Sequence, residues 1–166
     1  MKERKIMPFD KNFVPALRFA VMSDIHIDDE DCIEEQRFAK ALDDLKNLCS
    51  SDERYSGFDA LVIVGDFASR GSEIQMRKVK KILDAGLPAD VRLIMTMASH
   101  EYMTDGEENA LRRFDEIFGL TPDTHAVING FDFIAVTTTR GCHFDEKKRG
   151  FVSAELEKAA ERDSKK

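Results

Sequence analysis

The stretch Leu61-Val62-Ile63-Val64-Gly65-Asp66 decides the fold class, because it is a short β-branched apolar run that stops at an acid. Such a run is typical of a strand buried inside a parallel sheet. The stretches Ala20–His26 and Leu93–Glu101 repeat the pattern, each ending in acidic or histidine side chains. Ligands bind at the carboxyl ends of the strands in an α/β sheet. The sequence therefore predicts one pocket that gathers Asp24, His26, Asp66 and His100.

The rest of the sequence predicts an α/β fold with a parallel start and an antiparallel extension, joined in a mixed sheet. Apolar residues at three- and four-residue spacing indicate helices, while Ser72, Gly86 and Gly119 are typical of helix ends. Asn129-Gly130 between two apolar runs indicates a tight hairpin. The expected strands cover residues 17–23, 60–64, 91–97, 126–128 and 131–137, with the first two buried, and the expected helices cover 31–49, 72–85, 107–118 and 153–162.

The composition limits the class of protein. The 166 residues suffice for an N-terminal arm over 1–16 and a single domain over 17–166. The net charge of -7 argues against strong generic binding to nucleic-acid backbones. No apolar run approaches the length of a membrane span. Three widely spaced cysteines fit neither a zinc knuckle nor a disulfide framework, so we expect a reduced, cytoplasmic protein.

Metal chemistry is the leading interpretation of the three strand ends. On an extended segment the side chains of Asp24 and His26 point the same way, so a carboxylate and an imidazole can hold one ion. Asp66, with Gly65 beside it for close approach, suits a carboxylate that bridges two ions. His100 is placed to protonate a departing alkoxide, with Glu101 as the residue that orients it.

Each motif also has an interpretation without chemistry. Taken alone, Asp24 and Asp66 are also typical of carboxylates that cap a loop or a helix, and Ser99–Glu101 of a polar turn. The guanidinium of Arg70 could bind a phosphate oxygen, but a surface arginine in a turn is the more common case. The coincidence of three such motifs, each at a strand end and separated by helices, favours the metal interpretation.

The order and spacing of these motifs resemble the calcineurin-like metallophosphoesterase family. Its members carry Asp-x-His, then Gly-Asp, then Gly-Asn-His followed by an acid, at about these intervals. The resemblance covers roughly residues 17–160 and implies a four-layer α/β/β/α sandwich with a two-metal phosphoesterase site. It implies that Asp24 and His26 hold the first ion, that Asp66 bridges both, and that His100 acts near the leaving group. Manganese, iron or zinc suits these donors better than calcium.

Departures from the family pattern are expected to weaken the site. Ser99 stands where the family has an asparagine that ligates the second ion, and a serine hydroxyl is a shorter, poorer donor. Ala98 replaces a glycine, which predicts strain if the turn needs a positive φ. The domain is also expected to be C-terminally incomplete, because the family's later histidine motifs do not follow. His125 and His143 are expected to be solvated rather than to replace them, which leaves the second ion few ligands.

We therefore expect a metal-dependent phosphoesterase that acts on phosphomonoesters or phosphodiesters through metal-activated water, with impaired activity in this chain. The alternative is an inactive remnant of the fold that binds one ion or acts as a protein-interaction module. A receiver-like signalling domain is a third hypothesis, but it would need neither His26 nor His100. An uncovered sheet edge and apolar surface would favour a homo-oligomer or edge pairing between copies.

Overall fold

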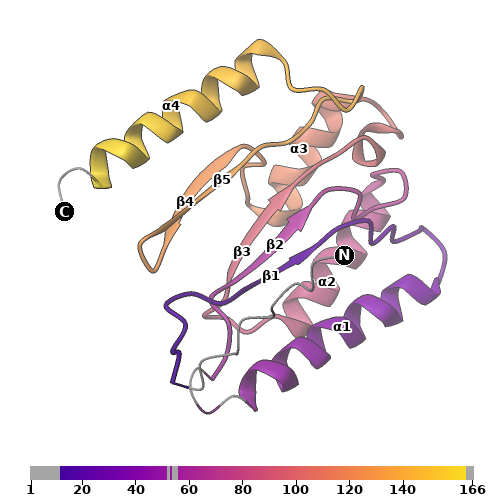
Figure 1. The fold of residues 1–166 in the computed structure, drawn as a ribbon. Helices are drawn as coiled ribbons and strands as arrows, with labels where there is room; N and C mark the ends of the chain where they lie inside the picture. Colours follow the sequence, from indigo (N-terminus) through magenta and orange to yellow (C-terminus); the bar gives the residue numbers. More distant parts are fainter. Residues whose placement is uncertain (1–11, 52, 54–55, 164–166) are drawn as a thin grey trace, which may run out of the picture.

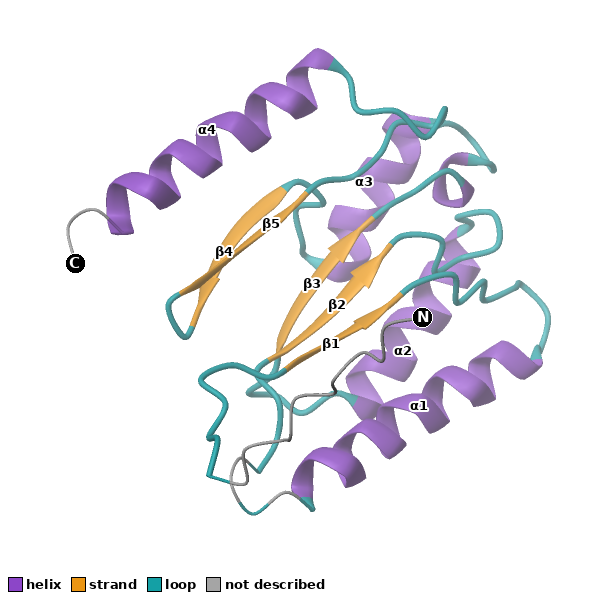
Figure 2. Cartoon of the chain, viewed as in Figure 1, coloured by secondary structure: helices purple, strands orange, loops and turns teal. Residues whose placement is uncertain are grey.

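The computed structural model describes residues 12–51, 53 and 56–163, and it shows parallel strands beside three helices, then a hairpin and a last helix (Figures 1 and 2). Residues 1–11 of the expected N-terminal arm lie outside this description, and residues 12–18 contain no helix or strand. The elements are β1 Phe19–Met22, α1 Ile33–Ser50, β2 Ala60–Val64, α2 Glu73–Gly86, β3 Arg92–Thr96, the 3-10 helix η1 His100–Tyr102, α3 Glu107–Phe118, β4 Thr124–Ile128, β5 Phe131–Ala135 and α4 Glu146–Asp163.

The three parallel strands lie in the order β1-β2-β3, so β1 is an edge strand of this sheet. Phe19 and Val21 of β1 are 48% and 56% exposed. The expectation that the first strand is buried is therefore wrong. β2 has a partner on each side and is buried along nearly its whole length. An apolar run alone does not reveal which position a strand takes, because that position depends on long-range pairing.

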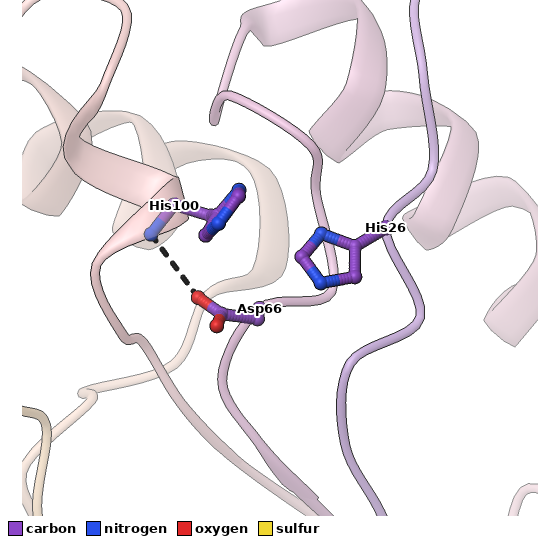
Figure 3. Close-up of side chains that lie close together, drawn as sticks. All are labelled: His26, Asp66 and His100. Carbon is purple, nitrogen blue, oxygen red and sulfur yellow. Dashed lines mark hydrogen bonds between the residues drawn. The ribbon is translucent and has the colours of Figure 1, made fainter.

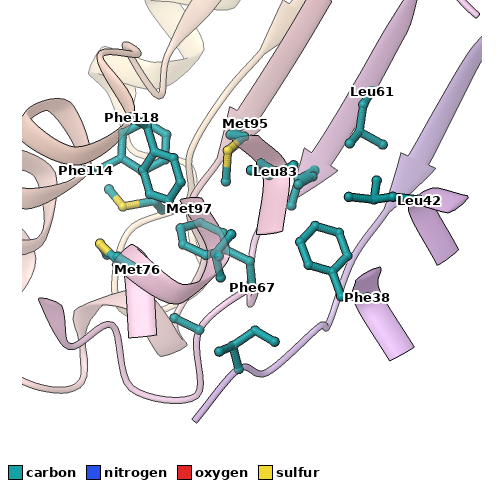
Figure 4. Close-up of a cluster of buried hydrophobic side chains, with 14 of the residues drawn as sticks. Phe38, Leu42, Leu61, Phe67, Met76, Leu83, Met95, Met97, Phe114 and Phe118 are labelled. Carbon is teal, nitrogen blue, oxygen red and sulfur yellow. The ribbon is translucent and has the colours of Figure 1, made fainter. Parts of the chain in front are cut away.

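Helices α1, α2 and α3 cover one face of the parallel sheet. The buried apolar core lies between these helices and the sheet (Figure 4). Successive side chains of a strand point to opposite faces. Leu61 and Ile63 of β2 and Met95 of β3 therefore point together into this core. The helices contribute further buried side chains, including Phe38, Leu42, Met76, Leu83, Phe114 and Phe118.

The opposite face of the sheet lies toward the hairpin of β4 and β5. The ring of Phe133 in β5 is edge-on to that of Phe19 in β1, with centroids 5.2 Å apart. Asn129 and Gly130 form the hairpin turn, with φ of 51° and 86°. β4 pairs with β5 in a separate antiparallel sheet, so the strands form two sheets rather than one mixed sheet. The α/β class expected from the sequence is confirmed.

An open, largely apolar groove of about 1240 Å³ lies between this second face of the parallel sheet, β5 and α4. Val62 of β2 and Ile94 of β3 line it on the side of the sheet, and Phe144 and Val152 line it on the side of α4. α4 itself lies beyond the hairpin, on the side of the molecule away from α1 (Figure 1).

The last helix begins at Glu146, well before the expected start at Ser153. The Asp145 side chain accepts a hydrogen bond from the Lys148 N–H at 2.8 Å, as an N-cap residue does. A charged run and Gly150 weaken the apolar periodicity of this first part, which is why the sequence pattern missed it. Within the described residues, no helix combines the length and apolar character that crossing a membrane requires.

Charged side chains attach α4 to the hairpin. His125 in β4 is only 13% exposed; its Nδ1 lies 2.7 Å from Glu155 Oε2, and its Nε2 lies 2.5 Å from Asp132 Oδ1. Arg162 pairs with Asp132, and Lys158 pairs with Glu155 at 2.6 Å. The hydrogen bonds to Asp132 and Glu155 raise the pKa of His125. The expectation that His125 is solvated is therefore wrong.

Candidate metal centre

β1 and β2 remain in register beyond the sheet, across the two loops that carry the first candidate ligands. Met22 pairs with Ile63, and Ile27 forms a parallel bridge with Ala68, so four residues separate the two pairings on each strand. Between them, the residue 26 N–H donates to the residue 66 carbonyl oxygen at 3.0 Å. Loops of equal length therefore place His26 beside the loop of Asp66.

The backbone is left-handed at three candidate positions, with φ of 55° at Asp24, 54° at His26 and 50° at Asp66. Among residues other than glycine, Asp, Asn and His adopt this conformation most readily. The expectation of an extended Asp24–His26 segment is wrong. The two side chains still meet, because Asp24 Oδ1 lies 3.8 Å from His26 Nε2. Left-handed turns, rather than strand alternation, bring them together.

His26, Asp66 and His100 follow three different strands and gather in one place (Figure 3). One ligand atom of each residue lies within 4.8 Å of the others. The rings of His26 and His100 are edge-on, with centroids 4.6 Å apart. Two imidazole nitrogens and a carboxylate oxygen form a donor set that suits a divalent transition metal. Asp24 lies next to His26, exposed and outside this group of three.

Two hydrogen bonds fix His100. Its backbone N–H donates to Asp66 Oδ1 at 3.1 Å, and its ring Nδ1 lies 2.8 Å from the Ser69 carbonyl oxygen. Because a carbonyl oxygen only accepts, Nδ1 carries the proton in this contact and Nε2 is left for an ion or for proton transfer. No sequence pattern pointed to Ser69, because its contribution is a backbone oxygen.

The family comparison covers most of the chain. Residues 17–158 match the calcineurin-like phosphoesterases. The chain belongs to this family. The resemblance found in the sequence motifs is thereby confirmed, and the family is one of metal-dependent phosphoesterases. A comparison with curated proteins found no match.

In this member of the family, Glu101 contacts backbone N–H groups rather than the ring of His100. Its carboxylate is fully buried; Oε1 accepts from the Ala68 N–H at 3.0 Å, and Oε2 accepts from the Asp66 and Ala98 N–H groups at 2.9 Å. Burial raises the pKa of Glu101 to about 7, while the three N–H donors lower it in part. The expectation that Glu101 orients His100 is wrong, because a carbonyl oxygen does so.

The two residues that depart from the family pattern are accommodated differently. Ala98 does not have a positive φ, so the strain considered for it is absent. Gly65 has φ of 78°, and a Cβ there would lie 2.5 Å from the Ala98 Cβ. The methyl group of Ala98 therefore fills the space that Gly65 leaves. Ser99 is half-buried at the start of η1, and its hydroxyl makes no capping hydrogen bond. Its role as an ion ligand stays a prediction.

Arg70 and His143 are both exposed. Arg70 is exposed; its N–H donates to Gln75 Oε1 at 2.8 Å, and its carbonyl oxygen accepts from Thr104. Among the residues described, none forms a hydrogen bond or ion pair with the Arg70 guanidinium, so phosphate binding by Arg70 stays a prediction. His143 is exposed, as expected.

Proposed function

We propose that this chain hydrolyses phosphomonoesters or phosphodiesters with the help of bound manganese, iron or zinc. The observation that carries the proposal is the convergence of His26, Asp66 and His100 from three strand ends in a family of metal-dependent phosphoesterases. When bound, a divalent ion polarises the phosphoryl group and activates water for attack on phosphorus. The imidazole of His26 and the carboxylates of Asp24 and Asp66 are donors that fit these metals.

Each residue has its own task in this proposal. Asp24 and His26 would hold the first ion, and Asp66 would be a ligand shared with the second. Ser99 is the weak ligand of the second position, which is why we expect impaired activity. His100 holds or moves a proton at Nε2 on the side of the leaving oxygen, because its Nδ1 is held by the Ser69 carbonyl. Arg70 is assigned to a phosphate oxygen of the substrate.

Metal content and hydrolysis test the proposal on the full chain. We expect manganese-dependent turnover of an aryl phosphodiester or monoester. Asp66→Asn keeps the size and tolerates the left-handed backbone. It should lower turnover by more than about 100-fold, since even outer-shell partners of a metal account for about 10–100-fold. Asp115→Asn, on the exposed side of α3, is the matched control and should leave turnover unchanged. Absence of ion binding at any manganese or zinc concentration would contradict the proposal.

The alternative function is a remnant that binds one ion without turnover and acts through protein contacts. Exposed apolar side chains on the edge strand β1, Phe19 and Val21, favour contacts between copies of the chain. One loosely held ion without hydrolysis would support this alternative. Sedimentation tests the self-association, which a compact monomer at high concentration would contradict.

A cytoplasmic location and a phosphate-ester substrate complete the proposal. Cys32, Cys49 and Cys142 are all unpaired, as is usual in a reducing compartment. The net charge of -7 disfavours generic binding to nucleic acid, while bound cations would still attract a small anionic substrate. Retention of activity only under oxidising conditions would argue against this location.

A further inference from the structure

We propose that Glu101 is a positioning residue, which sets the separation of the loops that carry Asp66 and His100 and thereby the geometry of the metal centre. The inference rests on the proposed function. It concerns the point where β2 and β3 stop pairing, after Val64 and Thr96. Between residues 65–69 and 97–100 of the described chain, the backbone forms no hydrogen bond of its own.

The Glu101 carboxylate replaces the missing backbone pairing. Two of its N–H donors, Asp66 and Ala68, belong to the loop after β2, and the third, Ala98, belongs to the loop after β3. Oε2 accepts from both Asp66 and Ala98, so one oxygen atom joins the two loops directly. Because the side chain is fully buried, water does not compete for these bonds.

Asp66 is consequently held at both its backbone and its side chain by two consecutive residues. Its N–H donates to Glu101 Oε2, and its Oδ1 accepts from the His100 N–H. The first bond fixes the left-handed backbone of Asp66, and the second fixes the rotation of its carboxylate. The His100 bond uses Oδ1, so Oδ2 is the other oxygen that Asp66 can offer to an ion.

Close packing prevents the Glu101 backbone from moving to compensate for a lost bond. Gly71, with φ of 70°, lies so close that a Cβ there would be 1.9 Å from the Glu101 carbonyl oxygen. A Cβ at Gly65 would likewise lie only 2.5 Å from the Ala98 Cβ. Loss of one of the three N–H bonds would therefore change the positions of the candidate ligands, because the Glu101 backbone cannot move to restore it.

Glu101→Gln tests the inference through the affinity for Mn²⁺. An amide has one acceptor oxygen and an NH2 donor, so in either orientation its NH2 meets at least one of the three N–H groups. We expect the Kd for Mn²⁺ to rise by about 10–100-fold, as for other outer-shell partners. Circular dichroism checks that the variant is folded. Glu155→Gln, which alters another buried carboxylate far from the centre, should leave the Kd unchanged.

Amide hydrogen exchange in the metal-free protein provides a readout that does not depend on ion binding. The Ala68 and Ala98 amides should exchange more than about 10-fold faster in Glu101→Gln, while the Ile63 amide in β2 stays as slow as in the parent chain. A folded variant with unchanged Mn²⁺ affinity and unchanged exchange would overturn the inference.

Two further outcomes separate this inference from the proposed function. If Glu101→Gln does not fold, Glu101→Asp keeps both acceptor oxygens on a shorter stem. It should fold with weakened Mn²⁺ binding, and parental affinity would overturn the inference. If the parent chain binds no Mn²⁺, the proposed function fails, and the positioning role is decided by the amide exchange alone.

Discussion

Different forces hold the two halves of the molecule together: the parallel half of β1–β3 with α1–α3, and the hairpin half of β4, β5 and α4. In the parallel half, three helices and the sheet share a continuous apolar core. In the hairpin half, no residue of β4 or β5 is fully buried, and the buried residues of α4 are the charged Lys148 and Glu155. The first half depends on apolar burial, and the second depends on paired charges.

The difference explains where the candidate centre lies. Every member of the group His26, Asp66 and His100 follows a strand of the parallel half. Burial of apolar surface is insensitive to modest changes of pH and salt, whereas paired charges respond to both. Ligands that must be held within tenths of an ångström are therefore attached to the half whose packing does not vary with solution conditions.

Truncation of a phenylalanine side chain should give the largest difference in stability loss between the two halves. Phe114→Ala removes a fully buried ring that packs against Phe67 and Phe118, and should cost about 3–5 kcal/mol of unfolding free energy. Phe131→Ala is the matched change in the hairpin half, where the side chain is 48% exposed, and should cost less than about 1 kcal/mol. Urea unfolding measures both, and equal losses would show that the hairpin half has an apolar core of its own.

Glycine replacement should give the next largest effect. Gly71 and Gly130 have φ of 70° and 86°, so alanine is strained at both, by about 1–2 kcal/mol. Only at Gly71 would the new Cβ also meet a backbone atom, at 1.9 Å from the Glu101 carbonyl oxygen. We expect Gly71→Ala to cost about 1–3 kcal/mol more than Gly130→Ala. Equal losses of unfolding free energy in urea would mean that the loops of the centre can shift to make room for the new Cβ.

The sequence predicted the parallel half better than the hairpin half. β2 at 60–64 and α3 at 107–118 have the expected bounds, because their signals are local: a β-branched run in one case and a terminal Gly119 in the other. His125 pairs with Glu155, 30 residues away, and no local pattern predicts such a contact. The sequence pattern also missed the start of α4, because charged pairs rather than periodic apolar residues hold this helix against the hairpin.

For the candidate centre, the sequence predicted the residue types and their convergence, but not how they are held. The pattern of acids and histidines at strand ends identified His26, Asp66 and His100. The left-handed backbone, the Ser69 carbonyl oxygen and the carboxylate of Glu101 depend on contacts between separate loops. The sequence states which side chains are present, whereas contacts with backbone groups of other loops depend on how the chain folds.

A change of pH should weaken the hairpin half selectively. The pKa of His125 is raised above its ordinary 6.5 in the folded chain, so its stabilising contribution is complete below pH 6.5 and is lost as pH rises through the folded value. Asp132 and Glu155 have lowered pKa values, chiefly because of Arg162 and Lys158, so their contribution is lost only in acid, below 3.8 and 4.5.

Thermal unfolding of His125→Gln measures this pH effect. The parent chain should exceed the variant in Tm most clearly at about pH 5.5, and the difference should shrink toward about pH 8.5. His143→Gln changes an exposed histidine and should show no such trend. A constant difference across this range would mean that folding does not change the pKa of His125.

Salt should produce the smallest effect. About 1 M salt shortens the screening length to about 3 Å and weakens the partly exposed pairs of Lys158 and Arg162. We expect protection of α4 amides against hydrogen exchange to fall slightly, while β2 amides stay unchanged. Loss of protection in β2 as well would indicate that the two halves unfold together.

The left-handed backbone at Asp24, His26 and Asp66 also determines which replacements these positions accept. Valine and isoleucine are common in parallel strands, but β-branched side chains are disfavoured where φ is positive. In a saturation library, asparagine and glycine should preserve thermal stability best at all three sites while abolishing ion binding. Substitution of these residues by asparagine would thus remove ion binding and preserve the fold. A member of the family could lose its catalytic function in this way and remain a stable binding domain.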